Sequence, residues 1–514
     1  MPATIRAMQR HRPHRPPALR RVLLAAAILG VAGTELRAAP DDTPTTLYSA
    51  GDLVVGGKLE AGFGYFGARN IDFGRGNFNS TDGNRRRSRN WFEGYLKPTV
   101  TAEYALDGLG VLYGQASAIG AFTRGEGDAV FGRSTTSYQP ENVEPEDYFI
   151  GWRSDSALPS LGTDALDVSV GHQKFTIGDG FLILDGTADG WGRAAYYLAP
   201  RNAFRNTAIV RLNTSPVRAD LFHLEADVDQ QLLRGNDVPR TKLFGANVEW
   251  FASEPGRDDA RIAYQHRLRY VGLTFLHVYS AEDIPTDNTP PFAYNQASVA
   301  ANRRGLNVLA PRLGGSWVPA LPGLMFYGEY AREWNNEQDR KIDANAWFVE
   351  PRYEAKELPL KPALGYRFAH FSGDGNPSDG RDTSFDPLFY GTGKRGTGTW
   401  YVGEIFGQYA FFNSNVDVQQ ISLKVSPADP VTLGLLLYRF DLDRPRQYAG
   451  VTARHYMNEV DGYVEWTPAG WLKITAVAAA ARPGAAARQI SVEQPSGPDG
   501  KTIYLGELFA HFTF

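Results

Sequence analysis

The chain has 514 residues and a formal net charge of −4, so its bulk charge gives no reason to expect nucleic acid as a partner. Its 43% hydrophobic and 12% aromatic residues exclude a disordered polymer. The absence of cysteine excludes disulfides and, with only scattered histidines, leaves no zinc-binding set.

The first predicted element is a secretory signal peptide at residues 1–38. A basic stretch without acids precedes an apolar run of about a dozen residues, which is too short to cross a bilayer. Ala38 is the expected cleavage point, and a buried helix or a lone anchor is the alternative. We therefore expect one domain, residues 39–514, because no change in composition marks a linker.

Strands dominate the remainder, because apolar and polar residues alternate with a period of two. In residues 91–104, Phe92 and Val100 share one face while Glu93 and Lys97 share the other. Many runs are about ten residues long, the length that a tilted strand needs to cross a bilayer. The same alternation recurs at residues 58–66, 241–251, 361–370 and 457–468.

Aromatic residues at the strand ends and the unequal lengths of the connections indicate how these strands assemble. Short turns on one rim and long polar loops on the other are typical of outer-membrane proteins. We predict an all-β fold, a transmembrane antiparallel barrel of about 18 strands with long extracellular loops. The alternative is a soluble sandwich or propeller, but no blade repeat is present.

The chain ends on an alternating strand, GELFAHFTF, with Phe514 last. A closed barrel pairs its last strand with its first, which leaves no open edge. A terminal phenylalanine of this kind resembles the signal by which outer-membrane proteins are handed to the barrel assembly machinery. The expected location is thus the outer membrane, and lipid is expected against the apolar face.

The second face of each strand points into the lumen and carries charges of both signs. Glu93, Glu249 and Arg367 belong to this face. A charged lumen holds water or a polar plug, and eighteen strands leave room for an aqueous channel. Arginine is clustered in residues 192–211, and rings of arginine favour anions because guanidinium grips carboxylates in a fork. For any single arginine, a solvated loop charge is the alternative.

Three blocks carry a resemblance to a known family: GHQKFTIGDGFLILDGTADG (171–190), YLAPRNAFRNTAIVRL (197–212), and HFSGDGNPSDGRDTSFDPLFYG (370–391) with GTWYVGEI (398–405). They resemble the alginate-export family of outer-membrane proteins. The resemblance implies an 18-stranded barrel that passes anionic alginate through an arginine-lined pore guarded by loops. It also implies periplasmic polymer-export proteins as partners. On that resemblance the candidate pore-facing cations are Arg193, Arg201, Arg205 and Arg211.

The expected function is passive diffusion or export of an anionic saccharide or small anion, with no cofactor. A general small-solute uptake porin is the first alternative. A lipid hydrolase using His370 and Ser372 is the remote one, because a loop follows at once and no third catalytic partner is apparent.

A calcium site is a further, weaker hypothesis for the loop at residues 373–382. Oxygen ligands in that loop could hold calcium, although a polar turn is the favoured reading. The candidate ligands are Asp374, Asn376, Asp379 and Asp382.

Overall fold

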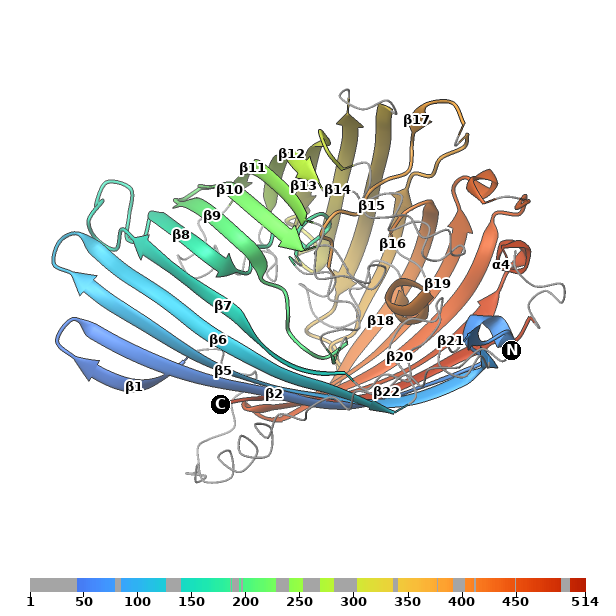
Figure 1. The fold of residues 1–514 in the computed structure, drawn as a ribbon, viewed down its shortest axis with the longest axis horizontal. Helices are drawn as coiled ribbons and strands as arrows, with labels where there is room; N and C mark the ends of the chain where they lie inside the picture. Colours follow the sequence, from blue (N-terminus) through green and yellow to red (C-terminus); the bar gives the residue numbers. More distant parts are fainter. Residues whose placement is uncertain are drawn as a thin grey trace, which may run out of the picture. The chain divides into compact units, whose positions relative to one another are not determined.

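In the computed structural model, antiparallel strands follow one another along most of the described chain (Figure 1). The structure describes residues 44–78, 85–125, 140–184, 186, 194–195, 197–227, 240–252, 269–281, 303–335, 341–376, 378–391, 403–410, 413–448, 450–490 and 500–514. The predicted signal peptide and its cleavage point lie outside the described residues.

Eighteen antiparallel strands form a closed ring, and each is hydrogen-bonded to its neighbours in chain order. Figure 1 labels these strands along the ribbon. The predicted fold class and strand number are confirmed. The strands of the ring are β2 (Leu53–Arg69), β5 (Ser88–Leu106), β6 (Gly110–Gly125), β7 (Glu141–Arg153), β8 (Leu166–Gln173), β9 (Phe204–Asn213), β10 (Val217–Asp227), β11 (Arg240–Phe251), β12 (Tyr270–Ala281), β13 (Asn307–Gly314), β14 (Leu324–Asn335), β15 (Lys341–Glu354), β16 (Ala363–Phe371), β18 (Val416–Ala428), β19 (Val431–Leu442), β20 (His455–Ala469), β21 (Leu472–Pro483) and β22 (Ile503–Thr513).

The last strand closes the ring as predicted. β22 pairs with β2 from Thr513 opposite Glu60 to Tyr504 opposite Arg69. Beyond it, Phe514 and Leu59 exchange two backbone hydrogen bonds of 2.9 Å. The terminal aromatic residue is therefore held in the wall, and the closed ring leaves no edge between β2 and β22 at these positions.

Short strands and helical turns lie outside the eighteen strands of the ring. β1 (Thr45–Ala50) pairs with the start of β2, and β17 (Arg381–Asp382) pairs with β15. β3 (Asn77–Phe78) and β4 (Arg85–Arg86) pair with each other. The helical pieces are α4 (Ala485–Gln489), two 3-10 turns (Ile71–Gly74 and Pro445–Gln447) and a π-helical turn (Gly403–Ala410). In the described part of the chain, no helix has the length and apolarity needed to cross a membrane.

The two faces of the wall differ as the alternation predicts. Outward positions are apolar and exposed on the isolated chain, for example Leu221, Leu435 and Leu508. The inward positions of β10 and β22 include the buried acids Asp220 and Glu507, whereas the inward position Leu436 of β19 is apolar. An apolar outer face of this kind is stable only against hydrocarbon.

Connections of unequal length define two rims. At the short-turn rim, residues 107–109, 214–216, 429–430 and 470–471 join neighbouring strands, and Phe514 lies here. At the long-loop rim, residues 126–140, 228–239 and 282–306 join neighbouring strands. The short-turn rim is the periplasmic one in barrels of the outer membrane.

Candidate pore and its lumen charges

Three segments fold from the wall into the lumen on the side of the long-loop rim. They are segment A (the described part of 174–203, after β8), segment B (385–391) and segment C (403–410). Phe175, Ile177 and Leu198 of segment A are buried, although they lie outside the strands. A connection rich in such residues is stable inside the barrel because it can pack there against apolar side chains.

Segments A and B touch each other inside the ring. Leu184 N–H donates to Phe389 O at 2.7 Å, and Phe389 N–H donates to Leu182 O at 3.0 Å. The Phe181 ring packs on Phe348, Phe371 and Phe385 with centroid distances of 5.4, 5.9 and 6.2 Å. This half of the lumen therefore has an apolar core of its own.

Carboxylates of the wall hold these segments by accepting backbone N–H groups. Glu93 on β5 accepts from Tyr197 and Leu198 of segment A at 3.0 and 3.1 Å. Glu459 on β20 accepts from Ile405 and Phe406 of segment C at 2.6 and 3.0 Å. The predicted lumen residue Glu93 faces inward, and its carboxylate binds backbone rather than open water.

Segment C also brings a buried acid of its own. The side chain of Glu404 is fully buried. The backbone N–H of Glu404 donates to Asp461 Oδ2 on β20 at 3.0 Å. Burial raises the pKa of Glu404 well above its usual value, and the neighbouring Glu507 and Asp461 carboxylates raise it further. A carboxyl with a raised pKa can remain neutral at neutral pH, which reduces repulsion among these acids.

Two buried arginines of the wall, Arg312 and Arg367, form ion pairs. Arg312 on β13 donates from Nη2 to Glu249 Oε1 at 2.6 Å, so the predicted lumen residue Glu249 neutralises an arginine. Segment A passes over this pair at Gly178, where φ is +56° and a Cβ would lie 3.1 Å from Arg312 Cδ. The predicted residue Arg367 on β16 is buried and donates to Glu350 Oε2 at 2.6 and 2.9 Å.

Arg303, just before β13, ties segment B to the wall. Its Nε and Nη2 donate to the Asp386 carboxylate at 2.6 and 2.8 Å. The guanidinium also lies 5.0 Å from the centroid of the Phe389 ring. Both charges are buried, so this fork fixes the position of segment B.

The half of the lumen toward the short-turn rim contains a cavity of about 760 Å³. β2, β5 to β10 and the ends of segment A line it. Six cations and four carboxylates are among its lining residues. The cations are Lys58, Lys97, Lys174, Arg153, Arg211 and Arg218, and the acids are Glu60, Glu103, Asp147 and Asp167.

Most of the lining cations have a carboxylate nearby. Lys97 Nζ lies 2.6 Å from Asp147 Oδ2, and Arg153 donates to both Glu103 oxygens at 3.0 and 2.6 Å. The predicted cation Arg211 lies 3.7 Å from Asp167 Oδ1 and 3.8 Å from Asp220 Oδ1, long distances that leave its guanidinium loosely held by both.

Lys174 is different. It follows the end of β8, its side chain is exposed to the cavity, and no carboxylate among the described residues lies within ion-pair distance of its Nζ. Although the side chain faces the lumen, the surrounding wall partly desolvates it. This desolvation, and then the nearby Lys97 ammonium, lower the pKa of Lys174 below the usual lysine value.

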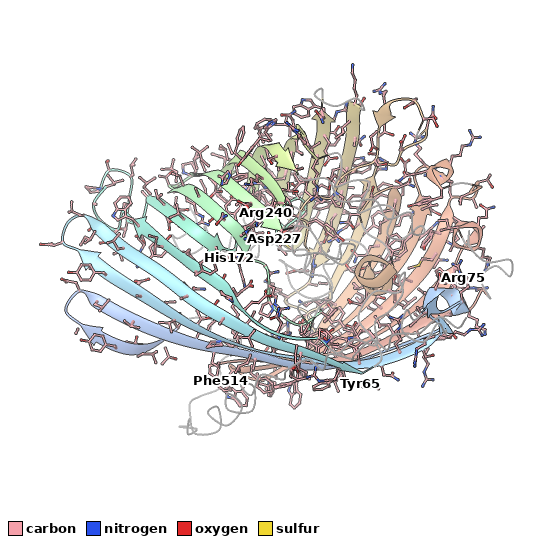
Figure 2. The ribbon with its side chains drawn as sticks, viewed as in Figure 1. Tyr65, Arg75, His172, Asp227, Arg240 and Phe514 are labelled. Atoms are coloured by element: carbon pink, nitrogen blue, oxygen red, sulfur yellow. The ribbon has the colours of Figure 1, made fainter. Side chains whose placement is uncertain are left out.

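The two other predicted arginines of segment A and β9 that the structure describes occupy different settings. Arg193 lies outside the described residues. Arg201 is buried in segment A, where its Nη1 donates to Ala194 O at 2.7 Å. Arg205 on β9 faces the lumen near the long-loop rim, 3.3 Å from Asp227, which Figure 2 labels beside Arg240. Of the predicted cations within the described part of the chain, Arg211 alone lines the cavity.

The sequence reasoning did not single out Lys174 or Arg153 as pore residues. Lys174 stands in the block GHQKF, at the point where alternation stops. The connection that follows Lys174 contains the apolar residues Phe175, Ile177 and Phe181. A connection this apolar is unfavourable in water, and this feature of the sequence could have predicted that it folds inward. That signal indicates an inward fold but does not show where Lys174 points.

The proposed calcium loop is built from side-chain turns. Asp374, Asn376, Asp379 and Asp382 each accept a backbone N–H two residues further along, at 3.1, 3.4, 2.9 and 3.0 Å. This is the polar-turn alternative. Separately, His370, Asp417 and Asp443 offer ligand atoms that all lie within 4.8 Å of one another.

His370 and Ser372 do not contact each other as a catalytic pair would. His370 Nδ1 lies 2.6 Å from Asp417 Oδ1, on the outer face of the wall. Ser372 Oγ donates to Thr383 O at 2.7 Å and accepts Asn345 N–H at 3.0 Å. The hydroxyl is thus a structural link between backbone segments.

Comparisons with known proteins agree with this geometry. A family model described as alginate export matches residues 201–478, more than half of the chain. A search of curated proteins by sequence finds no match.

Solved structures with a similar fold include outer-membrane proteins of Pseudomonas aeruginosa. The chain is similar to OccK5 (OpdH), with a TM-score of 0.54 and 11% identity over 90% of this chain and 98% of that one. It is also similar to OpdQ, with a TM-score of 0.50 and 10% identity over 90% and 98% of the two chains. Identities this low establish the fold only.

Proposed function

Because the chain belongs to the alginate export family, we propose that it passes an anionic saccharide such as alginate, or a small carboxylate, through its lumen by diffusion. The chain is an outer-membrane channel and not an enzyme. The proposal concerns what crosses it.

The observation that carries the proposal is the charge of the cavity. Its lining cations outnumber its lining carboxylates, and Lys174 offers an ammonium that has no ion-pair partner among the described residues, although Asp147 and Glu60 lie close enough to act on its charge. Lys97 and Arg211 lie in the same cavity. An anion that enters from the short-turn rim thus meets a net positive surface, which favours its entry electrostatically.

The mechanism follows from the strength of these contacts. A carboxylate would exchange part of its hydration shell for short-lived contacts with Lys174 and the loosely paired Arg211. Neighbouring acids such as Asp167 and Asp147 limit how tightly any one cation can hold it. Conduction needs binding that is good enough for entry and weak enough for exit.

Single-channel recording in planar bilayers tests the proposal through the anion-to-cation permeability ratio. We expect anion preference in the parent and a several-fold lower ratio in Lys174→Glu, because the substitution changes the local charge by two units. Lys361→Glu is the matched control, since Lys361 pairs with Asp429 on the outside of the short-turn rim. Cation preference in the parent would refute the proposal.

A second recording separates this proposal from a general small-solute porin. Oligomers of an anionic uronate should block the current at lower concentrations than a neutral oligosaccharide of equal length. Equal block by both would favour the general porin, for which the mixed sign of the cavity charges is the supporting observation.

Maturation and assembly are part of the same proposal. Residues 1–38 would be removed as a signal peptide, and the barrel assembly machinery would receive the strand that ends at Phe514. A periplasmic partner would deliver a polymer to the short-turn rim. Amino-terminal sequencing of protein extracted from outer membranes should begin near Ala39, and an intact Met1 would exclude the cleavage.

A further inference from the structure

Charged side chains cover one part of the outer face of the wall at the long-loop rim. The outward positions of β19 are leucines from Leu433 to Leu437, and then Arg439 and Asp441 follow toward this rim. On β20 and β21 the outward positions change from Val460 to Asn458, and from alanines to Arg482. The charges therefore begin where the apolar belt ends.

Strand register places these side chains side by side. Arg439 pairs with Asn458, and Asn458 pairs with Arg482, so the two arginines flank one asparagine on neighbouring strands. With strands about 4.8 Å apart, the Cα atoms of the two arginines lie about 10 Å from each other. Side chains as long as arginine can reach a common group over Asn458.

Two aspartates pair with Arg439 and Arg454 and are less exposed than these arginines are. Register sets Asp417 on β18 opposite Asp441 on β19. Arg454 Nη2 donates to Asp417 at 2.7 Å, and Arg439 Nε donates to Asp441 at 2.7 Å. The side chains of Arg439 and Arg454 are 52% and 57% exposed, while those of Asp441 and Asp417 are 17% and 16% exposed.

Three arginines (Arg439, Arg454 and Arg482) and two aspartates (Asp417 and Asp441) make up this arrangement, and the neighbouring Asp443 is paired with Arg444, so the formal charge of the surface is positive. A guanidinium has five N–H donors, and the carboxylates take only one or two from each arginine, so the remaining donors can face outward. Arg482 is exposed and has no ion pair or hydrogen bond with any part of the chain that the structure describes. We call this set the rim patch: Arg439, Arg454, Asn458 and Arg482.

We propose that the rim patch binds the phosphate groups of a lipid in the outer leaflet of the membrane. Its position fixes the class of partner, because the patch continues the belt that hydrocarbon covers and lies at the level of the headgroups. Its chemistry fixes the group, because arginines in a fork bind phosphate in a bidentate manner. Clusters of basic residues next to a membrane-embedded surface favour anionic lipid for the same reason.

Native mass spectrometry of the full chain in detergent tests this inference. The probe is an acylated glucosamine disaccharide that carries two phosphates, compared with the same lipid after removal of both phosphates. We expect the phosphorylated lipid to bind and the dephosphorylated lipid to bind about tenfold more weakly. Arg439→Gln with Arg482→Gln should remove most of that difference.

The matched control is Arg124→Gln on β6. Arg124 is an exposed outward arginine paired with Glu141 near the same rim, but it lies outside the rim patch. The control should bind the phosphorylated lipid as the parent does. Arg482 has no described ion pair, so Arg482→Gln removes a charge without breaking a described contact. If the double variant fails to insert into the membrane, this single variant should still bind the phosphorylated lipid more weakly than the parent does. Equal binding of the two lipids by the parent, or equal loss in Arg124→Gln, would overturn the inference.

Discussion

The two halves of the lumen use the same kinds of side chain in opposite ways. Toward the long-loop rim, Glu93 and Glu459 accept backbone N–H groups of the inward segments and are fully buried. Toward the short-turn rim, Glu103 and Asp147 pair with cations around an open cavity. An inward acid that accepts backbone N–H groups therefore holds a lumen segment in place. An inward acid that pairs with a cation instead lowers the positive charge of the cavity.

The largest effect should come from the apolar core of the closed half. Phe181→Ala removes a ring that packs on Phe348, Phe371 and Phe385, and we expect a loss of about 3–5 kcal/mol in the free energy of unfolding. Denaturant unfolding in detergent measures it. Phe149→Ala, at the wall of the cavity, should cost far less, and equal losses would erase the distinction between the halves.

The next effect concerns two glutamates of one strand. Glu459→Ala leaves the N–H groups of Ile405 and Phe406 without an acceptor, and we expect a loss of about 2–4 kcal/mol together with larger single-channel conductance. Glu465→Ala, which removes a partner of Lys473 on the same β20, should cost about 1 kcal/mol or less. A larger loss in Glu465→Ala would contradict our assignment of roles.

A smaller effect should appear in the pH dependence of the open half. Because the pKa of Lys174 is lowered, its ammonium loses its proton below the usual lysine pKa of about 10.4. The anion preference of the parent should therefore fall as pH rises through that lowered value. Lys174→Gln should lack this step, and an identical pH profile in both proteins would exclude Lys174 as the selective cation.

The smallest effect is expected at the outer surface of the short-turn rim. The hydrogen bond and the charge of Lys361 lower the pKa of Asp429. A lowered carboxyl pKa stabilises the fold above the unfolded value, and the contribution disappears as pH falls through the folded value. Because the pair is exposed to water, Lys361→Gln should leave the unfolding midpoint at pH 7 nearly unchanged. If Lys361→Gln shifted the unfolding midpoint as much as Glu459→Ala does, exposure to water would not weaken this surface pair relative to the contacts inside the lumen.

The alternation of apolar and polar residues was sufficient to predict the wall of the barrel. Phe92 and Glu93 are adjacent in the chain and lie on opposite faces because side chains of a strand alternate, whatever the neighbouring strand is. Closure through the strand that ends at Phe514 was predictable for a related reason, since an unpaired edge in hydrocarbon is costly. The inward orientation of Arg211, Arg367 and Glu249 followed from the same period.

The roles of these inward groups depended on tertiary structure. Arg367 and Arg211 are both inward arginines, yet Arg367 is buried against Glu350 while Arg211 lines the cavity. The difference arises from segments A, B and C, whose placement rests on contacts between residues far apart in the chain, such as Leu184 with Phe389. The period of two specifies a face, whereas the energy of a charge depends on the distance to its partner and on the water around it, and only the folded chain sets both.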